Sequence, residues 1–333
     1  MNSNIKQVWQ EALSNAITDP KELFALLDLD PELMKGTDAA IQQFPLKVPR
    51  GFVARMQKGN PHDPLLKQVL PLGIESNLVP GFDINPLLET AANPIPGLLH
   101  KYHGRVLVML TSACGIHCRY CFRRHFPYTE NITGRIGWEK IFAYIRQDSN
   151  INEVILSGGD PLAASDQLLK SFTDELIRIS QIKRLRIHTR LAVVLPERIT
   201  DGFIKWITQL PFDKVLVIHV NHPNEINADV MRALKCLQQA GITLLNQSVL
   251  LKDVNDHAKT LIELSETLFT AGVLPYYLHI LDKVQGAAHF NIDLNRAREL
   301  HAELCHQLPG YLVPKLVREE PGKLSKTSYS IGV

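Results

Sequence analysis

The fold is decided by the stretch Arg105-Val106-Leu107-Val108-Met109-Leu110-Thr111-Ser112-Ala113-Cys114-Gly115-Ile116-His117-Cys118-Arg119-Tyr120-Cys121. Its first seven residues are mostly apolar, which is typical of a parallel strand covered on both faces. Similar runs follow at residues 153–157, 184–189, 214–220, 243–251 and 273–281. Amphipathic helix patterns separate them, and the later runs recur about every 30 residues, the length of one βα unit. The pattern predicts an α/β fold, a partial parallel (β/α)6 barrel with its chemistry at the carboxyl ends of the strands.

The two ends of the chain do not follow this pattern. Short helical stretches interrupted by Pro20 and Pro31 come first, and a tract rich in Pro and Asn covers residues 61–96. We expect residues 1–100 to form a helical and loop extension packed on the barrel, which residues 101–310 build. Residues 311–333 are then a C-terminal tail.

The composition excludes several classes of protein. The 333 residues carry 36 Lys+Arg against 34 Asp+Glu, a net charge of +2 that argues against a nucleic-acid partner bound through a broad basic surface. No apolar run approaches the roughly 18–20 residues of a membrane span, and the polar start is unlike a signal peptide. Five cysteines are too few for a secreted disulfide scaffold, so we expect a cytoplasmic protein with no membrane partner. Cys236 and Cys305 are expected to be buried packing residues.

The other three cysteines carry the chemistry. Cys114, Cys118 and Cys121 have the spacing C-x3-C-x2-C, with an aromatic residue before the third. Three thiolates on one loop can hold three irons of a cubic cluster and leave the fourth open to a ligand. Two alternatives remain at this point: a Cys3His zinc site that uses His125, and three buried structural cysteines at helical spacing. The position directly after the first barrel strand argues against both.

This loop resembles the cluster loop of the radical S-adenosylmethionine superfamily, and the resemblance implies a [4Fe-4S] cluster whose open iron binds S-adenosylmethionine. The second strand ends in Ser157-Gly158-Gly159-Asp160, and paired glycines after a strand let a ligand approach the backbone closely. In the superfamily, a Gly-Gly-acid motif at this place contacts S-adenosylmethionine. The resemblance therefore assigns these four residues to that cofactor.

Longer segments are similar to the lysine 2,3-aminomutase family, namely residues 60–71, 219–225, 246–251 and 275–278. The similarity extends from about residue 55 to 328 and places His219 near S-adenosylmethionine. The family also carries pyridoxal 5′-phosphate on a lysine near the C-terminus. Counted from the acid Glu319, Lys326 and not Lys323 falls in that position. The other residues that the resemblance assigns to pyridoxal phosphate are Lys101, Tyr102, Arg105 and Gln247.

The substrate follows from charge and from the same resemblance. Arg123 matches the family arginine that binds the substrate carboxylate in a two-pronged contact. Asp282 and Glu319 match two positions that are acidic in the lysine enzymes, and a desolvated ammonium group requires anionic partners. Two acids at these positions favour L-lysine as the substrate.

The resemblance is strongest to the short bacterial enzymes that convert L-α-lysine to (R)-β-lysine for modification of elongation factor P. It implies a functional link to elongation factor P and its lysyl ligase, and an electron donor such as flavodoxin. The catabolic relatives continue well beyond the Lys-Thr pair, whereas this sequence ends six residues after Thr327. The alternatives are a free lysine 2,3-aminomutase of catabolism or β-lysine accumulation and, more remotely, a non-catalytic iron–sulfur or zinc module.

Overall fold

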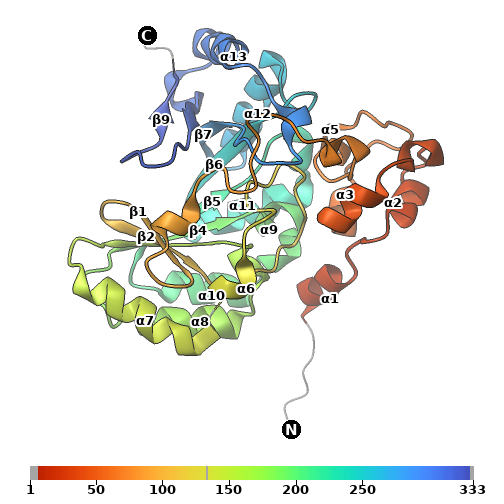
Figure 1. The fold of residues 1–333 in the computed structure, drawn as a ribbon. Helices are drawn as coiled ribbons and strands as arrows, with labels where there is room; N and C mark the ends of the chain where they lie inside the picture. The colour runs from red at the N-terminus through yellow and green to blue at the C-terminus, as the bar shows by residue number, and fades with distance from the viewer. Residues whose placement is uncertain (1–6, 133, 331–333) are drawn as a thin grey trace.

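A single curved sheet organises the computed structural model, which describes residues 7–132 and 134–330 (Figure 1). Its strands pair in chain order from β1 to β9. Their bounds are β1 Leu98–Tyr102, β2 Arg105–Met109, β3 Glu153–Ser157, β4 Arg184–Thr189, β5 Asp213–Ile218, β6 Thr243–Leu250, β7 Leu274–Ile280, β8 Lys315–Arg318 and β9 Thr327–Ser328. Strands β2 to β8 are parallel, and β1 and β9 join the two edges in antiparallel pairs. The six predicted strands are confirmed as β2 to β7, and three further strands join them: a seventh parallel strand, β8, and the two antiparallel edge strands.

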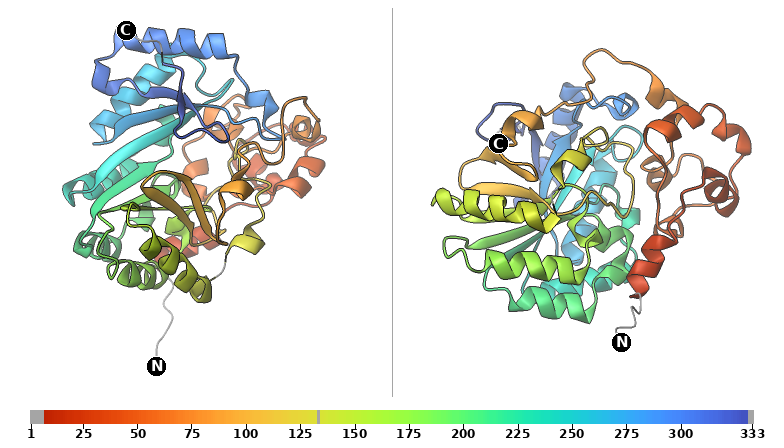
Figure 2. Two further views of the ribbon diagram at one scale, coloured as in Figure 1. Left: turned by 60° about the vertical axis from the view of Figure 1, so that its left-hand side comes forward. Right: turned by 60° about the horizontal axis from the view of Figure 1, so that its bottom comes forward.

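Helices lie on the outside of this sheet (Figure 2). The longer ones are α7 Gly134–Gln147, α8 Asp166–Leu176, α10 Asp201–Gln209, α11 Ala228–Gln239, α12 Ala258–Thr270 and α13 Leu294–Gln307. Several begin at a side-chain cap, because Ser165, Asn227 and Asp293 accept a hydrogen bond from the first turn of α8, α11 and α13. The shorter helices are α1 Val8–Ser14, α2 Pro20–Leu26, α3 Asp38–Gln43, α4 Arg50–Val53, α5 Pro64–Lys67, α6 Tyr128–Asn131 and α9 Leu191–Val194.

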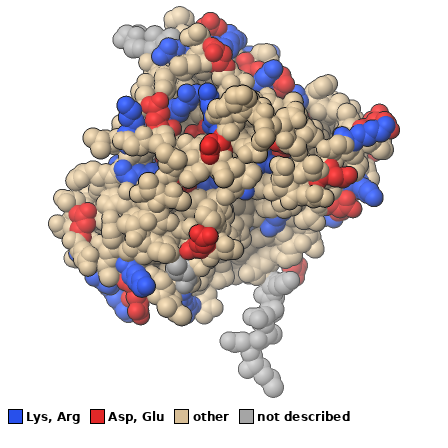
Figure 3. Space-filling view, in the orientation of Figure 1, with Lys and Arg blue, Asp and Glu red and all other residues tan. Residues whose placement is uncertain are grey.

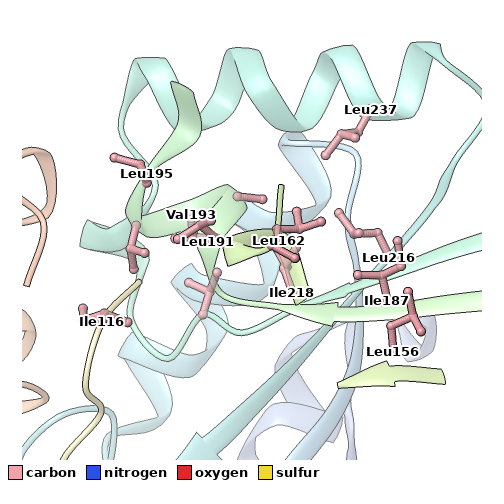
Figure 4. Packing of buried hydrophobic residues seen from close by; sticks show 14 of the residues in the cluster. Ile116, Leu156, Leu162, Ile187, Leu191, Val193, Leu195, Leu216, Ile218 and Leu237 are labelled. Carbon is pink, nitrogen blue, oxygen red and sulfur yellow. The ribbon is translucent and has the colours of Figure 1, made fainter. Parts of the chain in front are cut away.

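The hydrophobic core fills the space between the strands and these helices. Figure 4 shows side chains from β3, β4 and β5 packed with α11 and with the α9 segment, and all of them are buried. The cluster includes Ile116, which lies inside the cysteine loop and is 4% exposed. Full burial of such a side chain contributes about 1.5–3 kcal/mol. The loop is therefore anchored in the core on one side.

The opposite face of the strands lines the interior of the barrel. Burial alternates along β4 and β6, and partly exposed polar side chains such as Arg186, His188 and Gln247 lie on the inner face. The prediction that every strand is covered by apolar packing on both faces is wrong for these two. Their inner face is polar because it surrounds the site described below.

The N-terminal extension, coloured red to orange in Figure 1, packs against the side of the barrel and the cysteine loop. Its buried Trp9, Phe52 and Leu66 belong to the same hydrophobic cluster as the strands. A completely buried ion pair adds to this contact, because Glu75 accepts from both Arg119 and Arg124 of the loop. The extension thus holds the loop from the side opposite the core.

The two edges of the sheet meet without pairing as strands among the described residues. Lys101 of β1 and Glu319, just after β8, are joined by an ion pair of 2.5 Å. Figure 3 shows one face of the molecule, where basic and acidic side chains are scattered in mixed groups over a largely uncharged surface. Within the described residues, no helix combines the length and apolar character needed to cross a membrane.

The sequence predicts that the two cysteines outside the loop are buried packing residues. Cys236 is exposed, so the prediction is wrong for this residue, and Cys305 is half-buried.

Candidate active site

The cysteine loop leaves the carboxyl end of β2 and is held by backbone hydrogen bonds from the extension. The amide of His117 donates to the carbonyl of Lys47, and the amide of Arg119 donates to the carbonyl of Gln68, both at 2.9 Å. A turn follows, in which the amide of Cys121 donates to the carbonyl of Cys118 at 3.0 Å. The three thiols are therefore presented by a loop whose backbone is fixed at several points.

Burial and mutual proximity raise the pKa of two of these thiols. The pKa of Cys121 is raised to about 11 and that of Cys114 still further, first by desolvation and then by the neighbouring cysteines. Nη1 of Arg190 lies 2.7 Å from Sγ of Cys118 and donates to it. Three thiols in a buried site have the donor chemistry for an iron–sulfur cluster, whose irons compensate the thiolate charges.

The zinc alternative finds no support in this arrangement. In the described part of the chain, no three His, Cys, Asp or Glu side chains converge around one metal ion. Nε2 of His125 lies 3.2 Å from the carbonyl oxygen of Gln285. The residue that would complete a Cys3His set is therefore bonded to another part of the chain.

The glycine turn after β3 lies directly against the cysteine loop. A Cβ on Gly159 would lie 2.6 Å from the carbonyl oxygen of Ala113, so only glycine fits there. Gly158 has φ +107°, which also favours glycine, and its carbonyl accepts from the hydroxyl of Tyr128 at 2.7 Å. The predicted contact surface for S-adenosylmethionine is thus next to the three cysteines.

The side chain of Asp160 forms hydrogen bonds with residues at the end of the next strand, β4. Its buried carboxylate accepts from the hydroxyl of Thr189 at 2.6 Å and from the amides of Arg190 and Leu191 at 2.7 and 2.8 Å. These bonds fix the backbone at the end of β4. The guanidinium of Arg190 also donates to Gln68 and Glu225, at 2.7 and 3.0 Å. Asp160 therefore positions the arginine that reaches Cys118.

Histidines surround the barrel interior. Nε2 of Gln247 lies 2.9 Å from Nε2 of His219, and an amide nitrogen can only donate, so His219 is the acceptor. Burial lowers the pKa of His219 to about 3, which agrees with a neutral ring. His188 of β4 and His279 of β7 each have a buried Nε2 without a partner among the described residues. The pKa of both rings is lowered, first by burial and then by nearby cations that include Lys326.

Lys326 lies at the opposite side of the interior, in a row of alternating charges. Its Nζ donates to Glu319 at 2.8 Å, and the other oxygen of Glu319 accepts from Lys101. Burial opposes ionisation of Glu319, but the two lysines hold its pKa well below the usual range. The ring of Tyr277 lies 5.8 Å from Nζ of Lys326. Lys323 is exposed, so of the two tail lysines only Lys326 is drawn into the site.

Arg123 continues this row of charges. Its Nε and Nη2 donate to the two oxygens of Glu89 at 2.7 and 2.8 Å, and Lys101 donates to Glu89 at 2.9 Å. Nη1 of Arg123 lies 3.5 Å from the hydroxyl of Ser157. The row therefore runs Arg123, Glu89, Lys101, Glu319, Lys326, and it joins residues assigned to the substrate with residues assigned to pyridoxal phosphate.

Asp282 and Glu319, together with Lys283 and Arg318, line a cavity of about 360 Å³ beside this row. Oδ1 of Asp282 is buried and has no hydrogen-bond partner in the described structure. Desolvation, together with the charge of Glu319, raises the pKa of Asp282 to about 7. Glu319 is already paired with two lysines, so the unpaired oxygen of Asp282 is the acceptor that favours a cation here.

Among the described residues, Tyr102 and Arg105 contact each other, and neither forms a hydrogen bond with Lys326. The guanidinium of Arg105 lies 4.7 Å from the ring centre of Tyr102, on the hairpin of β1 and β2. Both residues border the edge of the sheet where Lys101 meets Glu319.

Comparison with known proteins decides the family. The model of the Radical SAM superfamily matches residues 108–265. The chain is 48% identical over 329 residues to the L-lysine 2,3-aminomutase of Escherichia coli, covering 98% of this chain and 96% of that protein. It belongs to the lysine 2,3-aminomutase family. The relative from Haemophilus influenzae is also 48% identical, over 98% of this chain and 96% of its own length. The relative from Clostridium subterminale is 34% identical, over 96% of this chain and 77% of its own length.

A lysine 2,3-aminomutase family member of the radical SAM superfamily is an isomerase with three cofactors: a [4Fe-4S] cluster, S-adenosylmethionine and pyridoxal phosphate. The residues present fit all three. The three thiols fit the cluster, the close glycine turn fits S-adenosylmethionine, and a lysine among partly buried charges and histidines fits pyridoxal phosphate.

Sequence reasoning missed several residues of this aminomutase-family site. Gln68 and Glu225 lie inside segments that resemble the family, but nothing in the sequence indicates that both bond Arg190. His279 follows the similar segment 275–278 directly, so its place on an inward strand face was a usable signal. Glu89 lies in the Pro- and Asn-rich tract and had no signal at all.

Proposed function

We propose that the protein is a radical S-adenosylmethionine and pyridoxal phosphate-dependent aminomutase that converts L-α-lysine to (R)-β-lysine. One observation carries the proposal: the unpartnered carboxylate oxygen of Asp282 beside Glu319, in a cavity linked by charged residues to Arg123. A lysine substrate has one ammonium for the acids and one carboxylate for the arginine. The relatives named L-lysine 2,3-aminomutase support the same substrate.

Each end of the substrate then has its own partner. The planar guanidinium of Arg123 binds the α-carboxylate, and the two acids bind the ε-ammonium. Cys114, Cys118 and Cys121 hold the cluster, and S-adenosylmethionine is bordered by Ser157, Gly158, Gly159, Asp160 and His219. Lys326 carries pyridoxal phosphate, with Lys101, Tyr102, Arg105 and Gln247 around it. When bound, the cluster with S-adenosylmethionine supplies the radical that removes a hydrogen, and pyridoxal phosphate supports the migrating amino group.

The rest of the chain positions these groups and excludes water. Asp160 fixes the end of β4, and through it the arginine that donates to Cys118. The neutral His219 accepts from Gln247 and so links the two sides of the interior. Fixed partners of this kind hold reacting groups at a productive distance without a reorganisation step.

The test is anaerobic incubation of the protein with labelled L-lysine, dithionite and S-adenosylmethionine, followed by NMR. We expect signals of β-lysine, and a chiral separation reads the configuration. If the cofactors are loaded and lysine is recovered unchanged, the proposal is wrong.

Lys326→Ala tests the cofactor lysine separately. We expect the variant to lose the pyridoxal absorbance of the purified protein while it keeps the iron–sulfur absorbance. Lys323→Ala is the matched control, since Lys323 is three residues away and exposed. Loss of pyridoxal absorbance in the control, and its retention in Lys326→Ala, would move the assignment to Lys323.

We further propose that the β-lysine serves modification of elongation factor P through its lysyl ligase, in the cytoplasm, with electrons from a donor such as flavodoxin. The higher identity to the Escherichia coli and Haemophilus influenzae relatives than to the clostridial one supports this branch of the family. Labelled lysine supplied together with elongation factor P and its ligase tests the route. Label on elongation factor P that depends on this enzyme supports it, and label confined to free β-lysine favours the catabolic alternative.

A further inference from the structure

Arg123 has two pairs of donors, and only one of them meets a carboxylate among the described residues. A guanidinium can meet a carboxylate side-on, through Nε and one Nη, or end-on, through Nη1 and Nη2. Glu89 takes the side-on pair, through Nε and Nη2. Nη1 lies at the end of β3, 3.5 Å from the hydroxyl of Ser157.

Two contacts determine the orientation of this guanidinium. It lies 4.6 Å from the ring centre of Phe122, a cation–π contact that fixes its plane. The two bonds to Glu89 fix its rotation within that plane, because a fork-to-fork contact has only one good geometry. With both fixed, the end-on pair of donors is presented to a second carboxylate, since the one bond of Nη1 within the described protein is the long one to Ser157.

The backbone before Glu89 is built to place this one side chain. Leu88 has φ +48°, a left-handed conformation that is unfavourable for leucine, and its side chain is 55% exposed. Glu89, the next residue, is 3% exposed. A strained, exposed leucine followed by a buried glutamate indicates that the turn serves Glu89.

We infer that Glu89 is a positioning residue for substrate selection, which holds Arg123 side-on so that its free edge receives the α-carboxylate of the substrate. This inference rests on the proposed role of Arg123. It adds that recognition of the carboxylate depends on a residue of the N-terminal extension. The contact to Lys101 also makes Glu89 a counter-ion for a second cation of the site.

The test compares two ligands that differ only at the carboxylate. L-lysine and L-lysinamide share the ammonium groups, and binding of each is measured without turnover, from the change in pyridoxal absorbance in the absence of S-adenosylmethionine. We expect Glu89→Gln to weaken binding of L-lysine about tenfold or more and to change binding of L-lysinamide by less than about twofold. The exposed Glu130→Gln is the control and should change neither.

A double-mutant cycle shows whether Glu89 acts through Arg123. In an Arg123→Gln background, we expect Glu89→Gln to have almost no further effect on L-lysine binding, and Glu89→Asp should restore part of it in the native background. Equal losses for both ligands, or independent effects of the two substitutions, would overturn the inference.

Measurements on the wild-type protein distinguish a failure of the proposed function from a failure of the role of Glu89. If it neither binds nor isomerises L-lysine, the proposed function fails. If it does both, and Glu89→Gln shows no preference between the ligands while retaining its pyridoxal phosphate, only the role of Glu89 fails.

Discussion

The cluster loop after β2 and the proposed substrate pocket after β7 and β8 both lie at the carboxyl ends of the strands, but they are built on opposite principles. We call these two regions the cluster end and the substrate end. At the cluster end, the charges that hold the loop are paired within the protein: Glu75 meets Arg119 and Arg124 with all three side chains fully buried. At the substrate end, Glu319 is divided between two lysines that are each about one-fifth exposed, and Asp282 has an oxygen with no partner among the described residues.

The difference reflects what each end has to do. A cluster needs its ligands in place before the metal arrives, so the protein stabilises that loop completely. A substrate pocket must gain free energy when the ligand binds, so it keeps polar groups that only the ligand can satisfy. The following substitutions test this difference between the two regions.

The largest expected effect is at the cluster itself. Cys118→Ala removes one of the three proposed iron ligands and the acceptor of the Arg190 bond, so we expect complete loss of turnover and of the visible iron–sulfur absorbance. Cys236→Ala is the control, because Cys236 is exposed and lies on α11 away from the loop. Iron content and absorbance after anaerobic purification provide the measurement. A coloured, iron-loaded Cys118→Ala protein would contradict the assignment of this residue.

The second-largest expected effect concerns the buried ion pair that supports the loop. Glu75→Gln leaves two arginines buried without a counter-charge, and breaking such a pair typically lowers the free energy of unfolding by about 3–5 kcal/mol. Urea unfolding of the variant measures this loss. Glu175→Gln removes the partner of Arg178 in an exposed pair and should change stability by no more than about 0.5 kcal/mol. Similar losses in the two variants would show that the extension does not brace the loop.

Much of the fold could be predicted because buried parallel strands leave a continuous apolar signature. Strands β2, β3 and β5 have it over most of their length, whereas burial alternates along β4 and β6, and their prediction also relied on the recurring βα spacing. The last two strands lack it: β9 has two residues, and β8 reads Lys-Leu-Val-Arg with only its middle buried. Their pairing depends on how the sheet curves, which brings Lys101 and Glu319 together across 218 residues of sequence.

The residues of the site also fall into two groups, those that could be predicted from the sequence and those that could not. Residues inside a spaced motif, such as the three cysteines and the paired glycines, could be assigned from sequence because the loop that holds them is local. Glu75 and Glu89 could not, because each acts through an arginine 34 or more positions away and neither lies in a chemically distinctive pattern. Tertiary contacts alone give these glutamates their roles.

Asp282→Asn tests the open substrate end. The folded protein raises the pKa of Asp282 to about 7, so wild-type stability falls as the pH rises from the ordinary range of an aspartate to that value, and then levels off. The asparagine of the variant does not ionise, so the stability of the variant does not fall with pH for this reason. We expect its stability advantage over wild type to be larger at pH 8 than at pH 5 by on the order of 2 kcal/mol. Thermal unfolding without substrate, at both pH values, measures the effect.

The affinity of the Asp282→Asn variant for L-lysine should fall, although its stability rises. The neutral amide of the Asp282→Asn variant would offer no charge to an ammonium group, so the stabilised variant should bind L-lysine more weakly than wild type at pH 8. A variant that is both more stable and equally good at binding lysine would show that Asp282 does not face the substrate.

The smallest expected effect concerns the turn that presents Glu89. A left-handed leucine costs roughly 1–2 kcal/mol, and a glycine there removes this strain but loses about 0.5–1 kcal/mol of backbone entropy. Leu88→Gly should therefore raise the free energy of unfolding by up to about 1 kcal/mol, because the exposed leucine side chain contributes little packing. Thr90→Gly, two residues on in the 3-10 turn Glu89–Ala92, carries the entropy loss without the relief and should lower stability by about 0.5–1 kcal/mol. Opposite signs in urea unfolding would show that the backbone at Leu88 is strained to serve the substrate end, whereas equal losses would show that the turn is ordinary.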